Sequence, residues 1–385
     1  MSRPLRIAIL AHSTNPRGGV VHALELGDAL TRLGHQAVVH APDARGTGFF
    51  RQTLCGTVSV PAAPVGPDVT EMVRIRVADY VRHFEDPAHR AFDVFHAQDG
   101  ISGNALATLK ERGLIVGFAR TVHHVDGFRD PVLLELQRRA IVSADRHFVV
   151  SRLWQDLLAE MHGLPSIVVG NGVDVARFSL VPDGREAALK ARLGLGAGPV
   201  VLSVGGVEAR KNTLRIFEAF LQLRALHPKA QLVVAGGASV LDHKDYAEEF
   251  TAALATSGLP ADAVIRTGPL AQDDMPALYR LADVLAFASV KEGFGLVALE
   301  AMACGTAVVL SRIPPFTEHV REEEAVWCDP KSPSSIANAL AVALSPELRE
   351  RLAEIGPRAA ARHDWAATAR AHLATYEELR EPAHV

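Results

Sequence analysis

Short runs of branched and aliphatic residues alternate along the chain with longer segments of helical periodicity. In the first half, the runs lie at Arg6–Ala11, Gln36–His40, Asp93–His96, Ile115–Ala119 and Arg146–Val150. In the second half, they lie at Val200–Val204, Gln231–Ala235, Val264–Thr267, Val284–Phe287 and Ala307–Leu310. Most are continuous rather than alternating, which is typical of strands buried on both faces. Helical patterns between them, such as Val20–Leu33, Lys211–His227 and Leu296–Cys304, predict an α/β protein with doubly wound parallel sheets.

A glycine-bearing segment divides the two series of strands. Gly170-Asn171-Gly172-Val173-Asp174 holds residues that tolerate positive φ, so we expect a hinge there. It separates a first domain of residues 1–170 from a second domain of residues 171–360. The helical pattern Asp364–Leu379 has no strand after it, and we expect this terminal helix (364–380) to pack back on the first domain.

One early segment allows two interpretations. Val69–Phe84 has apolar residues at helical spacing, with Arg74, Arg76, Arg82 and His83 between them. Such a helix could lie on a membrane surface or bind an acceptor. It could equally face the core and expose a basic side to water, and we favour this second interpretation.

Composition narrows the class of protein. The chain has 385 residues, of which 48% are hydrophobic and 22% charged, which is ordinary for a globular protein and argues against disorder. A net charge of −4 provides no attraction for nucleic acid or an anionic membrane. Cys55, Cys304 and Cys328 are too widely spaced for a zinc site or a disulfide framework. Prolines interrupt the uncharged stretch Gln52–Pro67, and the apolar run Leu5–Ala11 is short, so we expect no transmembrane segment, no signal peptide and a cytoplasmic location.

The most informative stretch runs from Ser289 to Gly305. A strand ends just before it, Glu292-Gly293-Phe294-Gly295 forms a turn, and a helix follows whose open N–H groups favour an anion such as a phosphate. Glu300 is the only charged residue of that apolar helix, and a buried carboxylate needs hydrogen-bond donors, which two adjacent sugar hydroxyls would supply. The alternatives are structural: Glu292 could favour the positive end of the helix, and Glu300 could pair with an arginine.

These residues resemble a known signature. E-G-F-G-x4-E-A-M-A-C-G, from Glu292 to Gly305, is similar to the E-x7-E motif of glycosyltransferase family 4, retaining nucleotide-sugar enzymes of the GT-B fold. Weaker matches follow in the expected order through most of the chain: Gly18-Gly19-Val20, Gly34-His35, Asn171-Gly-Val-Asp174, Arg210-Lys211-Asn212, Gly268, Leu281-Ala-Asp283-Val and Asp364-Trp365. The resemblance implies two Rossmann-like domains facing each other across a cleft, with the acceptor mainly on the first domain and the donor on the second.

The resemblance also implies roles for individual residues. Glu300 would bind the ribose hydroxyls, Glu292 the transferred sugar, and Lys211 the leaving diphosphate. His123 would contact the donor sugar near the reacting carbon, with His124 as the neighbouring alternative. The expected catalytic residues are therefore His123, Glu292 and Lys211, and the expected donor-binding residues are Gly18, Gly19, Arg210, Lys211, Gly293, Phe294, Gly295, Leu296 and Glu300.

One departure from the family pattern concerns the diphosphate. The family usually has arginine after the glycine that ends the first strand of the second domain, whereas this chain has Gly206. Arg210 or Arg266 could substitute, and the sequence does not choose between them. We find no D-x-D motif at a strand end, so we expect no metal and no cofactor, with Lys211, nearby arginine and helix N-termini meeting the phosphate charge.

The resulting expectation is a retaining hexosyltransferase. Its donor would be a nucleotide-diphospho-sugar, UDP-linked first and GDP-linked second, and its acceptor a hydroxyl of a small or lipid-linked molecule. Two other classes remain. A nicotinamide-dependent oxidoreductase is disfavoured because Ser13–Gly19 is not G-x-G-x-x-G. A nucleotide-sugar-binding protein that has lost catalysis would account for the missing arginine at Gly206.

Overall fold

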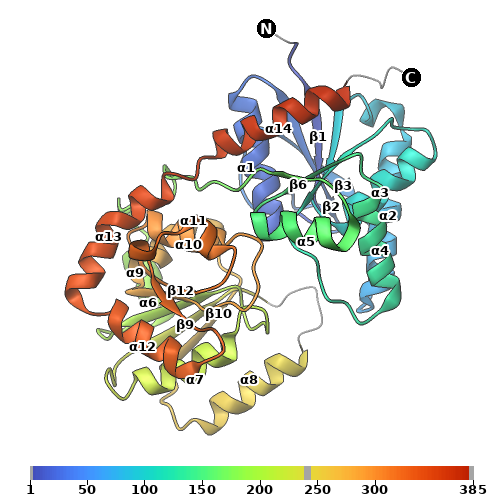
Figure 1. Cartoon of the computed structure of the whole chain (residues 1–385). Coiled ribbons are helices and arrows are strands. Elements are labelled where there is room, and N and C mark those ends of the chain that lie inside the picture. Colours follow the sequence, from blue (N-terminus) through green and yellow to red (C-terminus); the bar gives the residue numbers. More distant parts are fainter. Residues whose placement is uncertain (1–2, 238–243, 381–385) are drawn as a thin grey trace. The chain divides into compact units, whose positions relative to one another are not determined.

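The computed structural model describes residues 3–237 and 244–380, which form two compact units (Figure 1). Unit 1 comprises the chain up to Gly172 together with the residues from Asp364 onward, and unit 2 comprises Val173–His363. A Cβ atom on Gly172 would lie 2.4 Å from the backbone nitrogen of Trp365, so only glycine lets the two segments of unit 1 meet here. Within unit 2, Val173 N donates to His363 O over 3.0 Å, which ties its first and last residues together.

Unit 1 is built on one parallel sheet. In the part of the chain that the structure describes, the strand order is β3-β2-β1-β4-β5-β6-β7. The strands are β1 (Arg6–Leu10), β2 (Gln36–Asp43), β3 (Gly56–Pro61), β4 (Val94–Ala97), β5 (Ala119–Val122), β6 (Arg146–Val149) and β7 (Ile167–Val168). The order reverses between β1 and β4, and ligands of such sheets bind at the carboxyl ends of strands near that point.

Helices, most of them with buried apolar residues, accompany the strands of unit 1. They are α1 (Gly18–Arg32), α2 (Val69–Glu85), the 3₁₀ turn η1 (Pro87–His89), α3 (Gly100–Glu111), α4 (Pro131–Val142), α5 (Arg152–His162) and α14 (Trp365–Arg380). In α2, Tyr80 and Phe84 are fully buried and the buried Arg76 pairs with Asp79 over 2.8 Å. This helix faces the core, as the second interpretation of its sequence expects. The terminal helix α14 packs against α1 (Figure 1).

Unit 2 repeats the architecture. Its sheet, over the described residues, has the order β10-β9-β8-β11-β12-β13 and is parallel: β8 (Val200–Val204), β9 (Gln231–Ala235), β10 (Val264–Gly268), β11 (Val284–Phe287), β12 (Ala307–Ser311) and β13 (Val326–Cys328). Around it lie α6 (Glu186–Leu193), α7 (Thr213–Leu223), α8 (Lys244–Thr256), η2 (Gln272–Asp274), α9 (Met275–Leu281), α10 (Leu296–Ala303), α11 (Phe316–His319), η3 (Glu322–Glu324), α12 (Pro333–Ala343) and α13 (Pro346–Ala360). Phe217, Phe220 and Phe250 are fully buried in its core.

Local sequence misled the prediction at one central strand. The strand expected at Ile115–Ala119 begins only at Ala119, where it pairs with His96 of β4. Ile115 is buried in the core, but Val116 is 82% exposed, so most of this apolar run is a connecting segment and not a hydrogen-bonded strand. No helix within residues 3–237 and 244–380 is long and apolar enough to cross a membrane.

Candidate functional site

A buried lysine–glutamate pair lies at the carboxyl edge of the unit 2 sheet. Lys211 follows β8 and Glu292 follows β11, and these strands are hydrogen-bonded neighbours. Lys211 Nζ donates to Glu292 Oε1 over 2.7 Å and lies 4.5 Å from the centre of the Phe287 ring. Their side chains are only 11% and 7% exposed, so the pair is shielded from water.

Neighbouring charges set the ionisation of this pair. Burial lowers the pKa of Lys211, and the negative charge of Glu292 offsets this only in part. Burial alone would raise the pKa of Glu292, but the positive charges of Lys211 and Arg210 outweigh it and bring the pKa below its ordinary value. The Glu292 carboxylate is therefore held ionised at neutral pH, with Lys211 as its hydrogen-bond donor.

Arg210 is a second cation on the same carboxylate. Its Nη1 lies 3.0 Å from Glu292 Oε2, and its Nη2 lies 3.6 Å from Glu208 Oε2. Arg266 is an exposed residue of β10, the edge strand of the sheet. Of the two residues that could replace the missing arginine, the structure brings Arg210 to the Lys211–Glu292 pair.

Asn212 fixes the loop that carries both cations. Its φ of +62° is in the left-handed region, and its fully buried side chain donates to Ala288 O over 2.9 Å and to Pro330 O over 2.7 Å. These bonds tie the loop to the end of β11 and to the segment before α12. The helix therefore begins at Thr213, and not at Lys211 as the sequence pattern predicts.

Two glycine pairs explain why arginine is absent after β8. Gly205 and Gly206 have φ values of +125° and +77°, and both N–H groups donate to Ala235 O. A Cβ atom on Gly206 would lie 2.6 Å from Gly237 O, and one on Gly236 would lie 2.7 Å from Gly206 N. The loops after β8 and β9 thus touch backbone to backbone, which leaves no space for a side chain at Gly206.

The glycine-rich turn before α10 is held by aromatic rings. Gly295 has a φ of +102° and forms the N-cap, and a Cβ atom there would lie 2.5 Å from Phe316 Cε1. Phe294 is buried and stacks face to face on the His319 ring at 4.2 Å. Gly293 precedes it, and Leu296 is the first residue of the helix. The turn is therefore a rigid entry to α10 whose open N–H groups favour an anion.

Glu300 has a protein partner that the sequence did not indicate. Tyr279 of α9 donates its hydroxyl to Glu300 Oε2 over 2.6 Å. Burial raises the pKa of Glu300, while the Tyr279 hydroxyl and the charge of Arg177 oppose the rise. Glu300 is itself partly exposed. The carboxylate therefore has one internal donor, Tyr279, and retains the capacity to accept further hydroxyls.

In unit 1, the glycine loop and a histidine come together at the carboxyl ends of the strands. Gly18 and Gly19 open α1, and a Cβ atom on Gly19 would lie 3.5 Å from His123 Cδ2. His123 Nε2 lies 2.9 Å from Oε1 of Gln98, which follows β4. Burial, with nearby positive charge, lowers the pKa of His123 well below its ordinary value, so the ring is neutral. His124 instead pairs with Asp126 at 3.3 Å.

The sequence predicted no site role for three residues of these clusters: Gln98, Tyr279 and Asn212, which was noted only as part of the Arg210-Lys211-Asn212 match. Gln98 follows a predicted strand next to that of His123, so the convergence of adjacent strand ends could have indicated it. Asn212 and Tyr279 gave no such signal, because their importance lies in contacts between segments far apart in the sequence.

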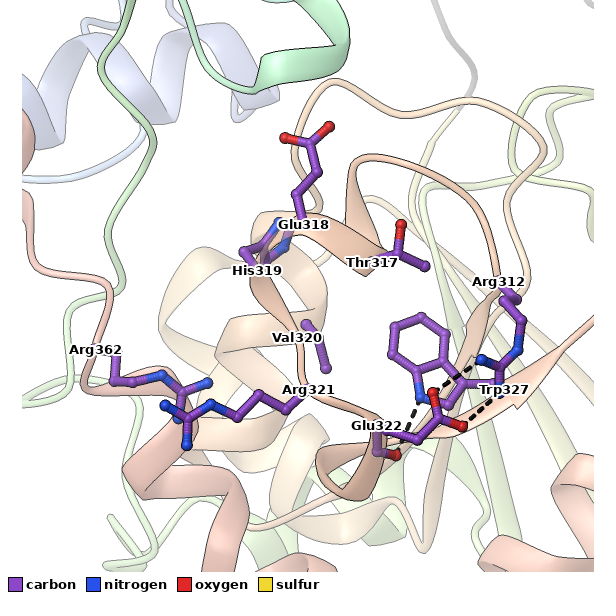
Figure 2. Close-up of a pocket in the computed structure, with 9 residues that line it drawn as sticks. All are labelled: Arg312, Thr317, Glu318, His319, Val320, Arg321, Glu322, Trp327 and Arg362. Atoms are coloured by element: carbon purple, nitrogen blue, oxygen red, sulfur yellow. Dashed lines mark hydrogen bonds and ion pairs between the residues drawn. The ribbon is translucent and has the colours of Figure 1, made fainter.

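A cavity of about 580 Å³ lies beside α11 (Figure 2). Arg312 pairs with Glu322, and Trp327 Nε1 donates to the Glu322 carbonyl oxygen over 3.1 Å. His319 lines the cavity and stacks on Phe294, so the cavity lies next to the glycine-rich turn. The lining residues are Arg312, Thr317, Glu318, His319, Val320, Arg321, Glu322, Trp327 and Arg362.

Comparisons with known proteins cover nearly the whole chain. Residues 16–177 match the family described as Glycosyltransferase Family 4, and residues 186–359 match Glycosyl transferases group 1. A D-inositol 3-phosphate glycosyltransferase of Xylanimonas cellulosilytica is 31% identical, with 99% of each chain covered.

Two solved structures share the fold. Sucrose-phosphate synthase from Thermosynechococcus elongatus superposes with a TM-score of 0.80 at 23% identity, over 97% of this chain and 99% of that one. Anabaena HepE, solved with UDP and glucose, gives a TM-score of 0.76 at 20% identity over the same shares. At these identities the likeness speaks for the fold alone.

Proposed function

This chain belongs to glycosyltransferase family 4, and from that premise we propose that it moves a hexosyl group from a nucleotide-diphospho-sugar to a hydroxyl acceptor with retention of configuration. UDP-linked sugar is the first donor and GDP-linked sugar the second. Unit 2 would bind the donor and unit 1 the acceptor, a small or lipid-linked molecule. No metal or other cofactor takes part in the proposed reaction.

The observation that carries the proposal is the placement of Lys211, Glu292 and Glu300 around the turn before α10. A nucleotide sugar presents a ribose diol, a diphosphate and a ring of hydroxyls. Glu300 offers acceptors to the diol, Lys211 offers a cation to the diphosphate, and Glu292 offers acceptors to the sugar. These three side chains, placed around one turn, match the diol, the diphosphate and the sugar hydroxyls. This match favours a nucleotide sugar over a nicotinamide cofactor.

The proposed chemistry uses the residues as follows. The bond between the anomeric carbon and the diphosphate oxygen breaks, and a bond to the acceptor oxygen forms on the same face of the sugar. The proton of the acceptor hydroxyl passes to the departing phosphate oxygen. Lys211, Arg210 and the open N–H groups at the start of α10 stabilise the charge that grows on the diphosphate. His123, being neutral, exchanges hydrogen bonds with sugar hydroxyls without adding charge.

The nucleotide bound in a solved structure of the same fold favours uridine over guanosine. HepE was solved with UDP and glucose, and its fold covers 97% of this chain. The test is a thermal-shift panel of UDP-, GDP- and ADP-sugars, because a ligand at 100 times its Kd adds about 2.7 kcal/mol of stability. We expect the largest shift with a UDP-sugar and its loss in Lys211→Ala. If no nucleotide sugar shifts the unfolding temperature, the proposal is wrong.

A second candidate function rests on Gly206. Without an arginine there, the protein could bind nucleotide sugar and no longer transfer it. Incubating the protein with a UDP-sugar that shifts its melting temperature distinguishes the two functions, since an active enzyme slowly hydrolyses its donor. Proton NMR of the released sugar then shows whether its first anomer matches that of the donor.

A further inference from the structure

We propose that Tyr279 is a positioning residue that holds the Glu300 carboxylate ready for the ribose hydroxyls of the donor. The inference rests on the proposed function, which assigns the ribose to Glu300. It adds a residue that would act through Glu300 and would not touch the nucleotide itself.

The geometry leaves the Tyr279 hydroxyl one clear partner. Tyr279 is fully buried in α9, and its hydroxyl donates to Glu300 Oε2 of α10 over 2.6 Å. Its ring makes an edge-to-face contact with that of Phe178, with ring centres 5.9 Å apart, and its carbonyl oxygen accepts the Thr306 hydroxyl over 2.6 Å. Ring and backbone are thus both fixed, so the hydroxyl is a rigid donor aimed at the carboxylate.

A carboxylate offers about four lone-pair sites, two on each oxygen. Tyr279 takes one site on Oε2, which leaves Oε1 and the second site of Oε2 for two neighbouring hydroxyls. A cis-diol such as that of ribose presents two donors at this spacing. Fixing one oxygen also prevents rotation of the group, so less rotamer freedom is lost when the nucleotide binds.

The pH dependence of nucleotide binding tests the proposal, because a change in packing alone would not alter that dependence. The groups around Glu300 are Tyr279 from α9, Arg177 from the segment before α6, and Cys304, which directly follows the helix of Glu300. Burial raises the pKa of Glu300, and Tyr279 and Arg177 hold the rise in check. The ionised carboxylate accepts hydrogen bonds from hydroxyls more strongly than the protonated carboxyl group does. Removing the Tyr279 hydroxyl therefore moves the acid limit of nucleotide binding to higher pH.

The experiment compares four variants of the full chain: Tyr279→Phe, Glu300→Gln, the double variant, and Tyr246→Phe. The last is the matched control, since Tyr246 of α8 also uses its hydroxyl, as acceptor from Leu214 N over 2.8 Å. UDP affinity is measured by calorimetry between about pH 5 and pH 8, the range in which phosphate groups also titrate. Dividing each affinity by that of Glu300→Gln at the same pH removes the titration of UDP itself.

We expect Tyr279→Phe to weaken UDP binding roughly 10-fold at neutral pH, the value of one hydrogen bond to a charged group. The deficit should grow as the pH falls, and the double variant should bind as Glu300→Gln does. If Glu300→Gln binds UDP as well as the parent, the ribose assignment in the proposed function is wrong. If Glu300→Gln binds weakly but Tyr279→Phe matches Tyr246→Phe at every pH, only the positioning role is wrong. A loss that is equal at every pH and adds to that of Glu300→Gln also overturns the positioning role, because it indicates packing.

Discussion

The carbonyl oxygen of Gly237 lies only 2.6 Å from the position that a Cβ atom on Gly206 would occupy. Because of this contact, the structure requires glycine at position 206, where the family usually has arginine. The loops after β8 and β9 approach so closely that the usual arginine has no room. In the proposed function, the neighbouring Lys211 and Arg210, which converge on Glu292, would meet the phosphate charge instead.

Restoring the arginine should therefore damage the protein. Gly206 has a φ of +77°, which costs a non-glycine residue roughly 1–3 kcal/mol, and the contact with Gly237 O adds to this. We expect Gly206→Ala and Gly206→Arg to lower the free energy of unfolding in urea. The matched control is Gly258→Ala, whose φ is +68° but whose Cβ atom meets nothing within 4 Å. Equal losses at the two positions would mean that the loop contact is unimportant.

Lys211 should matter more for turnover than for stability. Charge on the leaving diphosphate grows in the transition state, so Lys211→Ala should lower kcat roughly 100-fold or more. Glu292 keeps Arg210 as a partner at 3.0 Å, which limits the loss of stability. Steady-state rates and urea unfolding are compared with those of Lys190→Ala, an exposed lysine of α6. A large drop in stability with unchanged kcat would assign Lys211 a structural role only.

The sequence predicted the fold well because its strands are buried on both faces. Continuous runs such as Val200–Val204 leave little choice but a parallel sheet, and the expected GT-B fold class and family 4 membership are confirmed. Edge strands were harder to recognise: β13 has three residues, and β3 ends on Pro61 and exposes most of its side chains. Such segments carry little hydrophobic signal, because only one side is paired or buried.

Site geometry was predicted only where it follows from chain order. The turn from Glu292 to Gly295 could be placed because a strand precedes it and a helix follows it. The Tyr279–Glu300 hydrogen bond joins residues 21 positions apart on two helices, and no periodicity encodes it. Asn212 was noticed as part of the Arg210-Lys211-Asn212 match, but its φ of +62° and its contacts with Ala288 and Pro330 could not be predicted, because those partners lie far away in the sequence.

Asn212 should be sensitive to replacement because its side chain satisfies two buried carbonyl oxygens. Asn212→Gly keeps the backbone freedom needed for a positive φ but removes both hydrogen bonds, at a cost of roughly 2–4 kcal/mol. Asn212→Asp should cost more, because a carboxylate would face the oxygens of Ala288 and Pro330. Urea unfolding and UDP calorimetry should both report the change, since Lys211 is the adjacent residue. A stable Asn212→Asp variant with parental UDP affinity would contradict this role.

Buried histidines should make unit 1 sensitive to acid. His22, His96 and His372 lie together, with ring centres 5.5 Å apart for His96 and His372 and 6.2 Å apart for His22 and His372. Burial lowers the pKa of His22 to about 4 and that of His372 to about 3. The folded state therefore prefers neutral rings. In the unfolded chain each histidine has its ordinary pKa of about 6.5, so below that pH the unfolded chain binds more protons than the folded protein. Stability is retained above that pH and lost below it, by about 2 kcal/mol per histidine at pH 5.

Hydrogen exchange of the α14 amides measures the loss of stability in acid close to His372, which is part of this helix. Protection of the α14 amides should fall between about pH 7 and pH 5 in the parent, and fall less in His372→Leu, which removes one proton site. His227→Leu in unit 2 is the control, as this histidine is only partly buried. An unchanged acid response in His372→Leu would show that other groups, such as carboxylates, drive the loss.

Gly19 tests whether the glycine loop serves catalysis or only folding. A Cβ atom there would lie 3.5 Å and 3.7 Å from two atoms of the His123 ring, which is ordinary contact, so Gly19→Ala should fold and keep turnover within about 3-fold. Gly19→Val adds branches that reach into a ring already held by Gln98 and by His22, whose centre is 4.8 Å away. Because that ring cannot yield freely, we expect kcat to fall roughly 100-fold, a loss consistent with a small displacement of a reacting group. Most of the UDP affinity should remain, since Lys211, Arg210 and Glu300 of unit 2 would make the other proposed contacts with the nucleotide. Equal losses of UDP affinity and of kcat in Gly19→Val would instead indicate that the expected contact between Gly19 and the donor supplies most of the binding.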